Sequence, residues 1–160
     1  MFCNYAELQC VAHFSFLRGA SGCDELFAQA AICGLDALAI TDVNSVAGLV
    51  RAHEAAKNTG VRLIVGCRLL LTDGTVVLTY PTDRAAYSPL CRLLSPGKSR
   101  GGKGACHLDW CDLADHAEGL IAMLVTDRAD ALCGRRLSAL SGIFGNDAQC
   151  ALTLRRRPRV

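Results

Sequence analysis

The sequence predicts an α/β domain, and three patterns along its 160 residues lead to that prediction. Short apolar segments with strand character alternate with segments whose apolar residues recur every three or four positions, as on one face of a helix. The connections between these segments are only a few residues long, which favours parallel pairing of successive strands. An Asp-Gly pair also stands between two β-like runs, and this is a strong local signal for a hairpin.

The first half of the chain is expected to contain three parallel strands and two helices. Ser21 and Asp24 resemble a capping box that opens the first helix, and Gly34 ends it in a left-handed conformation. The second strand is a continuous apolar run of the kind that is covered on both faces, and it leads into Asp42. The expected strands are 7–13, 37–41 and 62–67, and the second helix, ended by Gly60, turns Val46, Leu49, Val50 and His53 inward.

The second half is expected to begin with a hairpin around Asp73-Gly74 and to continue with further helices and strands. The segment 95–105 holds four glycines, a proline and three cations, which predicts a mobile surface loop. The other expected elements are strands at 69–72, 75–78, 120–125 and 150–154, and helices at 87–94, around Trp110 and at 132–140.

The composition is that of an ordinary globular protein, with 51% hydrophobic residues, 20% charged residues and a formal net charge of +2. No apolar run approaches the ~20 residues that a membrane-spanning helix needs. The N-terminus lacks the basic and apolar regions of a signal peptide. We therefore expect a cytoplasmic protein that makes no contact with a membrane.

The cysteines predict neither a disulfide framework nor a metal site. There are 10 of them, yet no Cys-x-x-Cys pair occurs, and several lie in apolar patterns where a thiol acts as a small hydrophobic group. The nearest approach to a metal cluster is Cys106, His107, Cys111 and His116. Its spacing matches no zinc signature, so scattered thiols are the simpler interpretation.

Two basic segments are candidates for contact with phosphate. Gly97 to Lys103 has the glycine spacing of a P-loop, but Gly104 stands where a Ser or Thr would meet Mg²⁺, and the segment follows a helix instead of a strand. Nucleotide binding there remains an alternative to a cationic surface loop that contacts nucleic acid. The terminal run 155–159 either touches phosphates or is a solvated tail. The candidate nucleic-acid contacts are Lys98, Arg100 and Lys103.

The carboxyl ends of the parallel strands are where such folds gather ligand-binding groups. The sequence places His13, Asp42 and Arg68 at or near these ends. His13 stands beside Phe14 and reads as a packed residue, so Asp42 is the clearest candidate metal ligand. A hydrolytic metal centre cannot be built from one carboxylate.

At these strand ends the chain closely resembles the N-terminus of bacterial error-prone DNA polymerases, which are relatives of the DNA polymerase III alpha subunit. Their first domain is a polymerase-and-histidinol-phosphatase (PHP) domain, and the likeness runs from about Tyr5 to about Leu154. It implies a distorted (βα)₇ barrel, incomplete at the C-terminal side, with a PHP-like domain at 1–154 and a basic tail at 155–160. The segments that carry the likeness include YAELQC, FSFLRGAS, ALAITD, AGLVRAHEAAK and GVRLIVG.

The resemblance also implies that most of the family's metal ligands are missing. Asp42 remains as a vestigial ligand, and we expect no divalent metal in this chain. Arg18 or Arg68 could instead pair with Asp42 and convert a metal site into a structural ion pair. The family's other ligand positions, an H-x-H pair, an Asp, a His and a Glu, read here as Gln9 and Val11, Arg18, Val43 and Arg68.

The function that the resemblance implies is a non-catalytic scaffold domain of a polymerase for translesion synthesis and DNA repair. The parent family is a nucleotidyltransferase that uses Mg²⁺, but the polymerase region is absent from this sequence, so we expect the chain to be inactive alone. The expected partners are the remainder of the polymerase chain and DNA, and unpaired sheet edges could allow self-association. The alternatives are a PHP phosphoesterase or exonuclease with an atypical metal site, and a small nucleotide-binding module.

Overall fold

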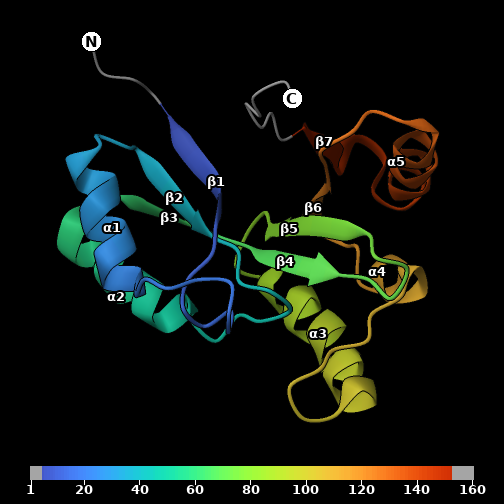
Figure 1. Cartoon of the computed structure of the whole chain (residues 1–160), viewed down its shortest axis with the longest axis horizontal. Coiled ribbons are helices and arrows are strands. Elements are labelled where there is room, and N and C mark those ends of the chain that lie inside the picture. Colours follow the sequence, from blue (N-terminus) through green and yellow to red (C-terminus); the bar gives the residue numbers. More distant parts are fainter. Residues whose placement is uncertain (1–4, 153–160) are drawn as a thin grey trace, which may run out of the picture. The chain divides into compact units, whose positions relative to one another are not determined.

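The structure is a computed structural model that describes residues 5–152, and its chain divides into two compact units, Met1–Arg68 and Leu69–Val160 (Figure 1). The basic tail predicted at 155–160 lies outside the described residues. One sheet has three strands in the order β1-β2-β3, and the other has four in the order β4-β5-β6-β7. The predicted α/β class is therefore confirmed, whereas the distorted (βα)₇ barrel, incomplete at its C-terminal side, stays a prediction. Within residues 5–152, no helix is long and apolar enough to cross a membrane.

The first unit has the parallel strand–helix alternation that the sequence predicts. β1 pairs in parallel with β2, and β2 pairs in parallel with β3. Every residue of β2 is buried, as expected for a strand covered on both faces. The elements are β1 (Ala6–Cys10), α1 (Cys23–Ile32), β2 (Ala37–Ile40), α2 (Leu49–Thr59) and β3 (Arg62–Val65).

The core of this unit differs from the prediction on one face of α2. Leu49 is buried as expected, but Val50 is 72% exposed and His53 is also exposed. The helix instead turns Ala52 and Ala55 inward, into a cluster of buried residues that includes Phe27 and Ile40. The small alanine side chains allow the helix backbone to come close to its neighbours. Their weak hydrophobic signal explains why the pattern favours the larger Val50 for the inner face, which is wrong.

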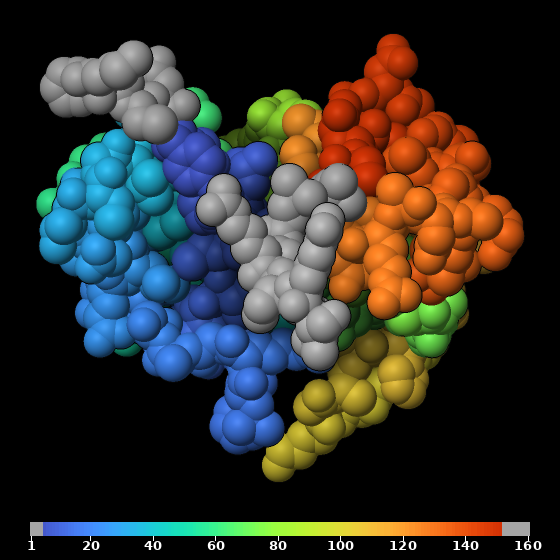
Figure 2. All heavy atoms as spheres, turned by 45° about the horizontal axis from the view of Figure 1, so that its top comes forward, coloured from blue at the N-terminus to red at the C-terminus, as the bar shows by residue number. Residues whose placement is uncertain are grey.

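The ends of the elements also differ in detail. β1 ends at Cys10, earlier than expected, and a loop follows that we call the 12–19 loop (Ala12–Gly19). It includes the blue projection at the lower edge of Figure 2. At the start of helix α1, the backbone N–H of Gly22 donates to the Glu25 carboxylate. The prediction placed this capping pair one position earlier, at Ser21 and Asp24. Gly34, at φ 71°, has the predicted left-handed conformation.

The second unit begins with the predicted hairpin. Gly74 has a φ of 79°, and its N–H donates to the carbonyl of Leu71 across the turn. β5 pairs antiparallel with β6, and β6 pairs in parallel with β7. The elements are β4 (Cys67–Leu70), whose first two residues belong to the first unit, β5 (Val76–Pro81), α3 (Tyr87–Gly101), α4 (Trp110–Asp115), β6 (Leu120–Thr126), α5 (Ala131–Phe144), a short 3-10 helix (Gly145–Asp147) and β7 (Ala148–Leu152).

The prediction of a mobile loop at 95–105 is wrong for most of this segment, because α3 continues through Pro96 to Gly101. Tertiary packing holds the extra turns in place. Gly97 is buried, and its carbonyl accepts a hydrogen bond from the N–H of His107. A Cβ atom on Gly97 would come within 2.5 Å of a methyl group of Leu108. The missing side chain therefore lets the following segment pack directly on the helix, a long-range effect that local composition does not reveal.

Replacing Gly97 with alanine should destabilise the second unit, although alanine normally favours a helix. The added methyl group would overpack the contact with Leu108 and cost about 1–3 kcal/mol of unfolding free energy. The matched control is Gly134→Ala in α5, where the new Cβ meets open space and should stabilise by about 0.5–1 kcal/mol. Urea unfolding followed by circular dichroism measures both, and equal effects of the two substitutions would contradict the packing at Gly97.

Candidate functional site

Asp42, the candidate metal ligand, lies directly after β2 and is only 1% exposed. One carboxylate oxygen, Oδ1, accepts hydrogen bonds from the backbone N–H of Ala12 at 2.9 Å and from the hydroxyl of Ser15 at 2.6 Å. The backbone of Asp42 is also held, because its carbonyl accepts from the N–H of Arg68 at 3.0 Å. The carboxylate thus connects the end of β2 to the 12–19 loop.

Ser15 is the centre of this connection. Its hydroxyl donates to Asp42 and accepts from the N–H of Val43 at 2.8 Å, so both functions of the hydroxyl are used. Its carbonyl accepts from the N–H groups of Arg18 and Gly19. The sequence places Ser15 near a strand end but does not predict this role. A small polar residue between two phenylalanines is the only available signal, and it does not specify a partner 27 residues away.

The second carboxylate oxygen of Asp42, Oδ2, is buried and has no hydrogen-bond partner among residues 5–152. It faces the turn before α2, since a Cβ on Gly48 would lie 3.0 Å from it. Burial raises the pKa of Asp42 above its ordinary value of 3.8, and the bonds from Ser15 and Ala12 only partly oppose this effect. Burial and the neighbouring Asp42 also raise the pKa of the Cys23 thiol to about 11, so that thiol stays protonated at neutral pH.

The predicted ion pair between Asp42 and an arginine is wrong. Arg68 donates from Nη2 to the side-chain oxygen of Gln9 at 2.9 Å, and Asp42 accepts its hydrogen bonds from Ala12 and Ser15. The reason is geometric: the 12–19 loop folds onto Asp42 and supplies uncharged donors to Oδ1, so this oxygen is hydrogen-bonded without a cation.

The residues around Asp42 do not fit a metal ion. Gln9 is engaged with Arg68, and the hydrophobic Val11 and Val43 offer no side-chain donor. Arg68 is a cation, which repels an arriving metal. Among residues 5–152, no group of three or more His, Cys, Asp or Glu side chains is placed to hold a metal ion. This finding covers the segment from Cys106 to His116 as well.

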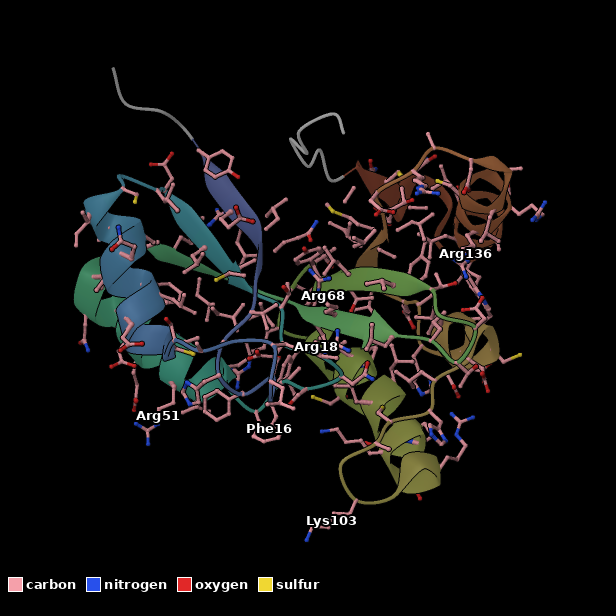
Figure 3. The ribbon with its side chains drawn as sticks, viewed as in Figure 1. Phe16, Arg18, Arg51, Arg68, Lys103 and Arg136 are labelled. Atoms are coloured by element: carbon pink, nitrogen blue, oxygen red, sulfur yellow. The ribbon has the colours of Figure 1, made fainter. Side chains whose placement is uncertain are left out.

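The basic residues predicted to contact nucleic acid are placed differently from one another. Lys98 and Arg100 lie in the last turns of α3, while Lys103 lies in the turn after it and projects away from the helix (Figure 3). Arg100 pairs with Asp112 at 2.5 Å and lies 3.7 Å from Asp109. Because Gly97 lies within a helix, the segment up to Lys103 does not form the strand-to-helix turn of a P-loop.

Comparison with known proteins identifies the family. The model of the PHP domain matches residues 7–149. The chain belongs to the PHP domain family. It is 60% identical over 155 residues to error-prone DNA polymerase 1 of Agrobacterium fabrum, and 56% identical over 155 residues to error-prone DNA polymerase 2 of Rhizobium meliloti. Each match covers 97% of this chain but only 14% of the relative, so this PHP chain spans about one seventh of their length. The resemblance read from the sequence is confirmed.

Solved structures share the fold of this PHP chain. A protein from Bifidobacterium adolescentis, described as a metal-dependent phosphoesterase, aligns with a TM-score of 0.67 over 91% of this chain and 75% of its own. An amidohydrolase from Chromobacterium violaceum aligns with a TM-score of 0.63 over 88% of this chain and 74% of its own. The sequence identities are 14% and 16%, so the likeness shows the fold alone.

Two substitutions of Asp42 should distinguish the effect of its hydrogen bonds on stability from the effect of its charge. Asp42→Ala leaves the Ala12 N–H and the Ser15 hydroxyl without their acceptor and should cost about 3 kcal/mol. Asp42→Asn keeps an acceptor oxygen and removes the buried charge, so we expect stability at neutral pH equal to or above that of the unmodified chain.

The pH dependence provides the control. Because the folded-state pKa of Asp42 is raised, the folded chain binds the proton of this carboxyl group more tightly than the unfolded chain does. The resulting stabilisation is fully present below the unfolded pKa and is lost as pH rises through the folded pKa. The stability advantage of Asp42→Asn over the unmodified chain should therefore grow from acidic toward neutral pH in urea unfolding curves. An advantage that shrinks over that range would contradict the buried-charge interpretation.

Proposed function

We propose that this chain is the N-terminal PHP module of an error-prone DNA polymerase and that it acts as a scaffold in translesion synthesis, without hydrolysing a substrate. The observation that carries the proposal is the bonding of Asp42. The remaining carboxylate of the site holds the 12–19 loop through Ala12 and Ser15. A group used in this way is a structural acceptor.

The module would form part of a longer chain, as in the relatives, which are about seven times its length. In that chain, residues 1–154 would belong to a distorted (βα)₇ barrel. Nucleotidyl transfer with Mg²⁺ would be the task of the larger polymerase region. Asp42, Gln9 and Arg68 would then contribute stability and shape to the module, with no part in chemistry.

Metal-dependent phosphoester hydrolysis is the second candidate, and one observation favours it. Oδ2 of Asp42 is a buried oxygen to which no described residue donates a hydrogen bond, and a cation could bind at such an oxygen. The available side chains weigh against this candidate, because the Cys23 thiol donates to the carbonyl of Gly48 and Gln9 is engaged by Arg68. The scaffold proposal is therefore better supported.

A chimeric polymerase tests the scaffold proposal. This chain would replace the matching N-terminal segment of error-prone DNA polymerase 1 of Agrobacterium fabrum, and primer extension would be measured. We expect activity close to that of the parent enzyme, since the two segments are 60% identical and the residues around Asp42 are not required for the chemistry.

Two results would contradict the proposal. One is a chimera without polymerase activity although the parent enzyme is active. The other is stoichiometric Mn²⁺ binding by the purified chain, accompanied by hydrolysis of p-nitrophenyl phosphate that Asp42→Asn abolishes. Mn²⁺ is the suitable probe because the many cysteines would attract Zn²⁺ unspecifically.

We also propose that the exposed end of α3 contacts the DNA backbone in the longer chain. Lys98 and Lys103 are exposed, and no salt bridge is formed by either one within the described residues. Arg100 is already engaged by Asp112, so its share in phosphate binding would be smaller. Backbone contacts of this kind are independent of sequence and sensitive to salt.

Combining Lys98→Ala with Lys103→Ala in the chimera should weaken binding to a primed DNA template. The salt dependence of the affinity should also fall, by about one unit of logarithmic slope for each phosphate that the variant no longer binds. Fluorescence anisotropy at several salt concentrations measures both effects. Lys57→Ala, which replaces an exposed lysine of α2, is the control. An equal weakening by the control and the double variant would refute the role of α3.

A further inference from the structure

The 12–19 loop presents large apolar side chains to solvent. Phe16 is 85% exposed and Leu17 is 89% exposed, and Phe14 is 36% exposed beside them. Phe16 lies on the outer side of the loop in Figure 3. Single exposed apolar residues are common on protein surfaces, but adjacent ones at a projecting loop tip mark a contact surface.

The loop is held in this conformation by hydrogen bonds. The N–H of His13 donates to the carbonyl of Ser21, and the N–H of Ser15 donates to the carbonyl of Ala12. The bond from Ser15 to Asp42 anchors its middle. Phe16 and Leu17 therefore cannot turn inward without breaking a buried network.

Leu17 supplies an independent observation. Its φ is 61°, in the left-handed region that leucine rarely adopts. Such a conformation persists only where the surrounding structure imposes it, and it is frequent at binding and functional sites. Here the imposed conformation directs two apolar side chains into water, which is unfavourable for the chain in isolation.

We propose that the 12–19 loop docks onto an apolar surface of the polymerase region in the longer chain. This inference rests on the proposed function, because the occupant is the remainder of that polymerase. A stable complex between free proteins buries about 800 Å² on each partner. Two or three side chains supply less, since a fully buried aromatic residue contributes about 150–250 Å².

A partner that belongs to the same polypeptide chain does not need an interface as large as that between free proteins. Its effective concentration is high, so a small apolar contact is sufficient to hold two parts of one chain together. The relatives provide such a partner, because their remaining length is about six times that of the segment matched here. A free protein or a second copy of this chain would need a larger interface than the loop provides.

The chimeric polymerase described above tests the docking. The double variant Phe16→Ser and Leu17→Asn removes the apolar side chains, and asparagine tolerates the left-handed backbone at position 17. Ile32→Ser is the matched control, because Ile32 is 79% exposed and lies at the opposite end of α1 from the loop. We expect thermal inactivation of the chimera to be about tenfold faster for the double variant and unchanged for the control. The melting temperature of the isolated chain should not fall for either.

The outcomes are distinguishable. If the unmodified chimera is active and the double variant inactivates at the same rate, the docking inference is overturned while the proposed function stands. If the unmodified chimera is inactive, the proposed function fails and the inference falls with it. Dimerisation of the isolated chain that the double variant abolishes would assign the loop to self-association. Weaker DNA binding by the double variant at unchanged stability would assign it to DNA. Either result would overturn the inference.

Discussion

The hydrogen bonds that Oδ1 of Asp42 accepts connect two parts of the first unit that are far apart in sequence. Ala12 and Ser15 belong to the loop after β1, whereas Asp42 follows β2, so the carboxylate joins the carboxyl ends of two neighbouring parallel strands. Ser15 extends the connection to the N–H of Val43. The position of the 12–19 loop, and with it the exposure of Phe16, depends on this small buried network.

The network also has an electrostatic consequence. A buried carboxylate with one oxygen unsatisfied is unfavourable in its charged form, which is why the pKa of Asp42 is raised. In a metal-binding protein a cation at such a position would stabilise the charge. Here Arg68 is turned to Gln9 and the thiol of Cys23 stays protonated, so neutral hydrogen-bond donors are what hold the group.

Membership of the PHP family does not by itself require metal ligands at the strand ends, because fold and chemistry depend on different residues. The parallel pairing of β1, β2 and β3 depends on apolar residues such as Leu38 and Ile40, which are buried. Metal binding depends on a few polar side chains at the strand ends. Those can change without affecting the sheet, provided that the remaining buried polar groups keep partners. Asp42 keeps two.

The sequence by itself determined the α/β class, the parallel order of the first three strands, the hairpin at Asp73-Gly74 and the placement of Asp42 at a strand end. These features depend on local patterns: apolar runs, helical spacing and turn residues act over a few positions. Only the tertiary structure decided the partners of Asp42, the inward face of α2 at Ala52 and Ala55, and the extension of α3 through Gly97. Each of these depends on contact between residues distant in sequence, as when Leu108 packs against a glycine that composition alone assigns to a loop.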